Sequence, residues 1–99
     1  MAARRSKPTK HVKVFYTGRV QGVGFRVTAE ETARRFGVVG WVKNLRDGRV
    51  ELVAEGDERI VTEFLEELRN GPMRNFISQV DVRWGGPVEA FSSFEIQYF

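Results

Sequence analysis

Hydrophobic residues recur along this chain with two periods, and the order in which the periods alternate limits the folds that the chain can adopt. A two-residue repeat predicts a strand, and a repeat of about 3.6 residues predicts a helix. The repeats follow the order strand, helix, strand, strand, helix, strand, with a short last strand. The predicted strands span 11–18, 38–44, 49–55, 80–84 and 94–98, and the predicted helices lie at 25–36 and between 57 and 70.

Two consecutive β-α-β units of this split kind predict one architecture. An antiparallel sheet that carries both helices on one face buries the apolar stripe of each helix. We therefore predict an α+β fold, the ferredoxin-like α/β sandwich, with the order β-α-β-β-α-β and a short terminal strand.

Short-range signals mark where these elements end. Gly37 follows the last apolar residue of the first predicted helix, where a C-terminal glycine belongs. Asp57 precedes the second helix and offers an N-cap. The sequence Arg-Asp-Gly at 46–48 predicts a tight turn between two strands.

Length and composition indicate the class of protein. We expect the 99 residues to form one domain with its own core. The absence of cysteine excludes disulfides, thiolate metal sites and a cysteine nucleophile. No apolar run approaches the roughly 20 residues that a membrane span needs, and the first ten residues lack the apolar stretch of a secretion signal. We expect a cytoplasmic protein that does not bind membranes.

The net charge of +3 is concentrated at the N-terminus. Residues 1–10 contain four basic residues and no acidic one, whereas residues 11–99 contain 12 basic and 13 acidic residues. A nucleic-acid-binding domain usually carries a basic face on its ordered elements. We therefore predict a disordered basic tail at 1–10, a folded domain at 11–99 and no nucleic-acid partner.

Several kinds of active site lack the residues that they need. His11 is the only histidine, and its position at the start of a strand beside the tail predicts a solvated edge residue. A Ser-His-Asp arrangement would have to recruit it. A transition-metal site would depend on carboxylates alone, so we expect no metal. Gly22 and Gly24 begin a dinucleotide-binding pattern, but Val27 stands where the third glycine belongs.

The segment GRVQGVGFR, residues 18–26, joins the first predicted strand to the first predicted helix. Glycines allow positive φ in such a loop, and successive main-chain N–H groups then form an anion site at the positive end of the helix. Arg26 adds a planar charged fork suited to phosphate oxygens. From these residues alone, two interpretations are open: an anion site, or a tight connection with Arg26 as a surface charge.

Two segments resemble the signature sequences of the acylphosphatase family, VQGVGFR at 20–26 and GWVKNLRDGRVELVAEG at 40–56. They occur in the family's order and at its usual separation, and the similarity extends over residues 11–98. The resemblance implies a ferredoxin-like enzyme that hydrolyses the carboxyl–phosphate bond of acyl phosphates. The products are a carboxylate and inorganic phosphate, and no metal or other cofactor is expected.

The resemblance also implies roles for individual residues. Arg26 matches the family's phosphate-binding arginine. Asn44 matches the asparagine that orients the attacking water, although by itself it would be interpreted as a strand-end cap. The implied phosphate-binding residues are Gly18, Arg19, Val20, Gln21, Gly22, Val23 and Arg26.

Two alternatives to an acylphosphatase stay open. One is a non-catalytic module that binds phosphate or carboxylate in the same loop. Asn44 beside an intact Arg26 disfavours it, because a simple anion site needs no water-positioning amide. The other is a carbamoyl-phosphate-handling domain, of the kind found in larger carbamoyl-transfer maturation factors, which the chain length disfavours. We expect a monomer whose ligand is a small acyl phosphate.

Overall fold

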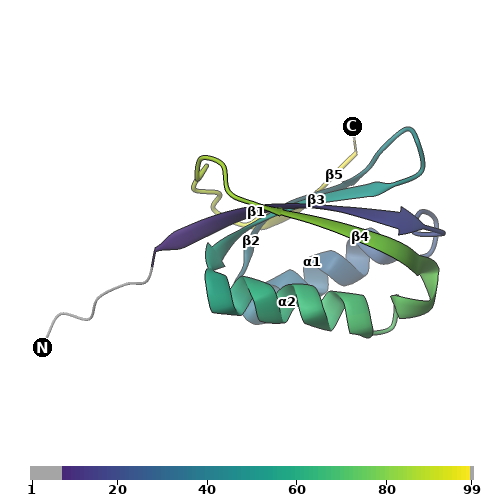
Figure 1. The fold of residues 1–99 in the computed structure, drawn as a ribbon, viewed down its shortest axis with the longest axis horizontal. Coiled ribbons are helices and arrows are strands. Elements are labelled where there is room, and N and C mark those ends of the chain that lie inside the picture. Colours follow the sequence, from purple (N-terminus) through teal and green to yellow (C-terminus); the bar gives the residue numbers. More distant parts are fainter. Residues whose placement is uncertain (1–7, 99) are drawn as a thin grey trace, which may run out of the picture.

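The computed structural model describes residues 8–98, which form a five-stranded sheet with two helices on one face (Figure 1). β1 begins two residues inside the predicted tail, and residues 1–7 of that tail lie outside the described residues. All predicted strands and helices are present, whereas the 3-10 helix η1 was not predicted. The elements are β1 (Thr9–Gly18), α1 (Phe25–Phe36), β2 (Val39–Asn44), β3 (Val50–Asp57), α2 (Glu58–Asn70), η1 (Arg74–Phe76), β4 (Ile77–Trp84) and β5 (Phe94–Gln97).

The strands lie in the order β4-β1-β3-β2-β5. The first four pair antiparallel, and β5 pairs with β2 in parallel. The ferredoxin-like α+β fold is therefore confirmed, with a mixed sheet in place of a wholly antiparallel one. β4 ends at the same end of the sheet where β2 begins. The loop 85–93 then crosses to the far edge of the sheet, so β5 runs parallel to β2.

Alternation along the strands directs apolar side chains toward the helices. Val12, Val14 and Tyr16 of β1 are at most 1% exposed on that face. The ring centroids of Tyr16 and Phe25 lie 4.8 Å apart, so aromatic packing holds the start of α1 against the end of β1. The buried helix residues are Phe25, Ala29, Thr32 and Ala33 of α1 and Val61, Phe64 and Leu68 of α2.

Both predicted helix ends are confirmed. Gly37 follows α1 with φ 72°, and its N–H donates to the main-chain oxygens of Ala33 and Arg34. The Asp57 carboxylate accepts from the N–H groups of Arg59 and Ile60 at the start of α2. No helix within residues 8–98 is long and apolar enough to cross a bilayer.

His11 lies on the sheet face away from the helices and is only 8% exposed, so the prediction of a solvated edge residue is wrong. Its Nδ1 lies 2.7 Å from Oε2 of Glu55. The loop 85–93 covers the pair, and the N–H groups of Glu89 and Ala90 donate to the Glu55 carboxylate at 2.6 and 2.9 Å. Burial raises the pKa of the Glu55 carboxyl, but these N–H groups and His11 hold it below its ordinary value.

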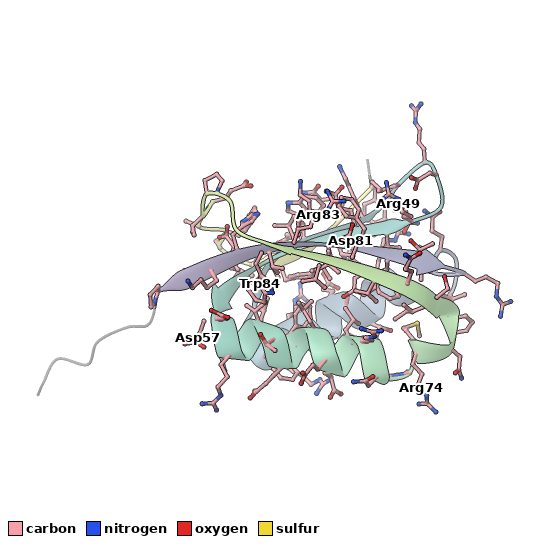
Figure 2. All side chains as sticks on the ribbon, viewed as in Figure 1. Arg49, Asp57, Arg74, Asp81, Arg83 and Trp84 are labelled. Atoms are coloured by element: carbon pink, nitrogen blue, oxygen red, sulfur yellow. The ribbon has the colours of Figure 1, made fainter. Side chains whose placement is uncertain are left out.

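Elsewhere on this outer face, charged side chains form ion pairs and pack on an aromatic ring. Figure 2 shows Arg49, Asp81 and Arg83 on the side of the sheet away from the helices. Arg83 Nη2 lies 2.8 Å from Asp81 Oδ2. The Cζ atoms of Arg49 and Arg83 lie 4.7 and 5.0 Å from the ring centroid of Phe15. The two guanidinium groups cover the Phe15 ring, so we interpret this group of charged side chains as structural.

Candidate functional site

Three strands end at the same edge of the sheet. β1 and β2 are both antiparallel to β3, and β5 is parallel to β2, so β1, β2 and β5 run in one direction. That edge carries the loop 18–24 after β1, Asn44 at the end of β2 and Tyr98 after β5. Because α1 begins directly after the loop, Arg26 belongs to the same edge. The topology thus collects Arg26, Asn44 and the loop from separate parts of the chain.

The loop between β1 and α1 has backbone angles that favour glycine. Gly22 and Gly24 have φ of 78° and 86°, and Gly24 is the N-cap of α1. A Cβ at either position would meet no atom within 4 Å, so the backbone angle and not crowding requires glycine. The open space beside this main chain lets an anion approach the N–H groups at the helix N-terminus.

Two side chains of the loop point into the protein. Val20 is 1% exposed and belongs to the core. Nε2 of Gln21 donates to the main-chain oxygens of Leu45 and Arg49 at 2.7 and 2.9 Å. The two side chains therefore anchor the loop, Val20 to the core and Gln21 to the β2–β3 hairpin, which leaves only their main-chain groups free for the predicted role in phosphate binding.

The remaining loop residues lie at the surface or at the rim of the core. Arg19 is exposed, with Cζ 5.8 Å from the ring centroid of Phe76. Val23 is partly buried and packs against the core. A Cβ on Gly18 would lie 2.2 Å from the main-chain oxygen of Phe76, so contact with the segment before β4 requires this glycine.

Arg26 occupies the first turn of α1 and is partly buried. Its Cζ lies 5.0 Å from the ring centroid of Tyr98, which is within cation–π range. Within residues 8–98 no carboxylate forms an ion pair with its guanidinium. The first turn of α1 also contains no acidic residue. An external anion can therefore bind the fork beside the positive end of the helix dipole.

Asn44 is the last residue of β2 and pairs with Val50 of β3. It follows Val42 by two residues, so its side chain lies on the face that packs against the helices. Its Oδ1 is buried and has no hydrogen-bond partner among the described residues. An unpaired buried acceptor costs about 1–3 kcal/mol, so we expect this oxygen to accept from a water or a ligand.

Hydrogen bonds fix the hairpin that follows Asn44. The Leu45 N–H donates to the main-chain oxygen of Arg49 at 2.8 Å. Asp47 accepts from the main-chain N–H and Nε of Arg49 at 3.0 and 2.8 Å, and these bonds hold the pKa of its carboxyl below the ordinary value. With the two bonds from Gln21, the hairpin and the loop form one connected unit.

Tyr98 is the residue of this edge that the sequence reasoning missed, because it was assigned only to the last strand. It follows β5, is 73% exposed and places its ring against Arg26. The alternation from Phe94 through Ile96 to Tyr98 indicated the face of the sheet on which Tyr98 lies. It could not indicate the neighbours of Tyr98 until β5 was known to pair with β2.

Other features of the described residues are weaker candidates. No group of three or more His, Cys, Asp or Glu residues within 8–98 is placed to hold a metal ion. A surface depression of about 530 Å³ lies at the opposite end of the sheet, beside Lys10, Asp57 and Arg59. Asp57 there already caps α2, and the long charged side chains are exposed. The edge with Arg26 and Asn44 is therefore the candidate site.

Comparison with known proteins identifies the family of this chain. The family model described as acylphosphatase matches residues 12–96. A protein named acylphosphatase from Roseiflexus sp. (strain RS-1) is 47% identical over 83 residues, which cover 84% of this chain and 89% of that protein. The crystal structure of acylphosphatase from Bacillus subtilis superposes with a TM-score of 0.84 and 37% identity, covering 90% of this chain and 99% of that one.

A larger protein shares the same unit. The crystal structure of HypF from T. kodakarensis matches with a TM-score of 0.77 and 30% identity. The match covers 89% of this chain but only 12% of that one. The family model and the full-length relatives together establish that the chain belongs to the acylphosphatase family.

Proposed function

We propose that the protein hydrolyses acyl phosphates to a carboxylate and inorganic phosphate. The observation that carries this proposal is the position of Asn44 at the edge that also holds Arg26 and the loop, where its buried Oδ1 has no hydrogen-bond partner among residues 8–98. A site that only bound an anion would need donors, whereas an unpaired acceptor suits a water molecule. Family membership supports the same reaction.

In the proposed mechanism, Arg26 and main-chain N–H groups of residues 18–23 bind the phosphate. The water oxygen attacks phosphorus while the bond from phosphorus to the bridging carboxylate oxygen breaks. The carboxylate leaves with the bonding electron pair, and the water loses its proton to solvent or to the phosphate product. A carboxylate is a good leaving group, so positioning and charge stabilisation supply most of the acceleration.

Asn44 is proposed to hold the attacking water. Its Oδ1 accepts a hydrogen bond from the water and fixes the water oxygen in line with the bond that breaks. Converting a chance encounter with water into a positioned one removes a large entropic part of the barrier. The amide does not titrate near neutral pH, so this role does not depend on a protonation state.

We propose that turnover requires no metal ion or other cofactor. The guanidinium of Arg26, the loop N–H groups and the helix dipole of α1 all place positive charge where the equatorial oxygens gain negative charge. These groups supply the stabilisation that a divalent cation provides in many phosphoryl-transfer enzymes.

We also propose that the enzyme is a cytoplasmic monomer. It is proposed to bind no nucleic acid, because the net charge of residues 11–99 is close to zero.

The test is the release of inorganic phosphate from acetyl phosphate and from benzoyl phosphate by the purified protein. We expect hydrolysis of both, well above the spontaneous rate and above that of the Arg26→Ala variant. A binding module would bind inorganic phosphate but leave both spontaneous rates unchanged. Carbamoyl phosphate belongs in the same assay, because a carbamoyl-phosphate-handling domain would act on it alone.

A further inference from the structure

The ring of Tyr98 lies beside Arg26 at the surface of the candidate site and not in the core. Its centroid is 5.0 Å from Cζ of Arg26, yet the residue is 73% exposed. An aromatic side chain in contact with a site arginine and open to solvent leaves apolar surface uncovered beside the phosphate position. That surface has no role in the mechanism described so far.

The sheet places Tyr98 there by register. β5 pairs in parallel with β2, and Gln97 is the partner of Lys43. One residue further along each strand are Tyr98, which follows β5, and Asn44, which ends β2. Alternation from Ile96 puts Tyr98 on the face that Asn44 shares with Val42. Figure 1 shows β5 ending beside the hairpin that joins β2 and β3.

The contact with Arg26 leaves both groups able to bind. A cation over an aromatic ring interacts through the ring face, so the N–H groups around the guanidinium edge can still donate to phosphate oxygens. Tyr98 as a whole stays 73% exposed despite this contact. Tyr98 can therefore contact a second molecule while its ring is held in place by Arg26.

The chemistry of the substrate determines which part of it reaches Tyr98. The loop and Arg26 bind the phosphate, so the acyl group must project out of the loop toward solvent. Small acyl groups such as acetyl offer little surface for contact. An aromatic acyl group is planar and large enough to pack on a ring at the rim, as aromatic pairs do.

We propose that Tyr98 is a specificity-determining residue that contacts the acyl group and favours aromatic acyl phosphates over acetyl phosphate. The inference rests on the proposed function, because it concerns the substrate of the same site. It assigns the phosphate half of the substrate to Arg26 and the loop, and the acyl half to Tyr98.

The experiment compares kcat/KM for benzoyl phosphate and acetyl phosphate in the wild type and in Tyr98→Phe, Tyr98→Leu and Tyr98→Ala. Each protein gives one ratio of the two values, and comparing this ratio between a variant and the wild type cancels the different intrinsic reactivities of the substrates. We expect Tyr98→Phe to keep the wild-type ratio and Tyr98→Ala to lower it by about five- to tenfold, the scale of one aromatic contact. Tyr98→Leu should fall between them. Val88→Ala, which truncates another exposed apolar residue in the loop 85–93, should not change the ratio.

Inhibition by inorganic phosphate separates this role from simple support of Arg26, since phosphate has no acyl group. We expect its inhibition constant to change little in Tyr98→Ala. A uniform loss for both substrates and for phosphate, with an unchanged ratio, would overturn the inference and leave the proposed function intact. If the wild type hydrolyses neither substrate, the proposed function fails, and this inference fails with it.

Discussion

The side-chain amide of Gln21 lies 2.7 Å from the main-chain oxygen of Leu45, so the glycine-rich loop is tied to the residue that follows Asn44. A second bond, to the main-chain oxygen of Arg49, closes the same connection at 2.9 Å. The two parts of the proposed site, the phosphate loop and the water-orienting amide, are thus held in one geometry by a side chain that need not touch the substrate.

Gln21→Ala should disturb this alignment. We expect kcat to fall about tenfold for every acyl phosphate and the free energy of unfolding to fall by about 1–2 kcal/mol for the two lost hydrogen bonds. Steady-state kinetics and urea unfolding measure the two effects. Gln79→Ala, which removes an exposed amide from β4, is the matched control. A variant that unfolds more easily but keeps its wild-type kcat would show that Gln21 is structural only.

Arg26→Lys should lose nearly as much activity as Arg26→Ala. A lysine ammonium is a point charge and cannot reproduce the planar fork that binds two phosphate oxygens. Both variants should also lose competitive inhibition by inorganic phosphate, measured with benzoyl phosphate as substrate. The control is Arg34→Ala, an exposed arginine of α1 that pairs with Glu30. Unchanged phosphate inhibition in Arg26→Ala would remove this residue from the proposed site.

The buried pair of His11 and Glu55 predicts a pH-dependent stability. The pKa of Glu55 in the folded protein lies below its ordinary value of 4.5. Its stabilising contribution is therefore complete above that value and is lost as the pH falls through the folded pKa. Glu55→Gln should lower the free energy of unfolding at pH 7 by about 2 kcal/mol, and the difference from the wild type should shrink below about pH 4.5.

Denaturant unfolding between pH 7 and pH 3 measures this difference. Glu66→Gln, which alters an exposed carboxylate of α2, should show no such trend. A Glu55→Gln deficit that stays constant across the range would mean that packing, and not the ionised carboxylate, stabilises the loop 85–93. Because the pair lies at the end of the sheet opposite Asn44, kcat at pH 7 should stay near the wild-type value.

The sequence predicted features that depend on neighbouring residues. Gly37 and Asp57 mark helix ends through hydrogen bonds to residues two to four positions away, so their roles could be inferred from the local pattern. The order of strands and helices along the chain followed from the periodicities of the apolar residues. Arg26 and Asn44 were assigned by family resemblance, and the sheet brings their elements to one edge.

The features that the sequence did not predict depend on residues far apart in the chain. The expectation that His11 is solvated was wrong because its partner Glu55 is 44 positions away and the covering loop is more distant still, so no local pattern indicates either contact. The Gln21 side chain binds carbonyl groups that any sequence would provide at 45 and 49, so no pattern marks them. The place of Tyr98 depended on β5 adding beside β2 in parallel.

Activity should be independent of divalent cations. The proposed mechanism assigns the stabilisation of phosphate charge to Arg26 and the loop N–H groups. Phosphate release from acetyl phosphate should therefore be unchanged after exhaustive treatment with a chelator and after addition of magnesium or zinc. A loss of activity on chelation that an added divalent ion restores would contradict this assignment.

The most direct test of the proposed site compares Asn44→Ala with the wild type in two measurements on the same preparation. These are kcat with benzoyl phosphate and the inhibition constant of inorganic phosphate. Since Oδ1 of Asn44 has no partner among the described residues, its removal should cost little stability, which circular dichroism and urea unfolding will check. Asn70→Ala, at the end of α2, is the control.

If Asn44 orients water while Arg26 holds phosphate, kcat should fall by about a hundredfold or more, and the phosphate inhibition constant should stay within about threefold of the wild type. A folded Asn44→Ala variant that hydrolyses benzoyl phosphate at the wild-type rate would contradict the account.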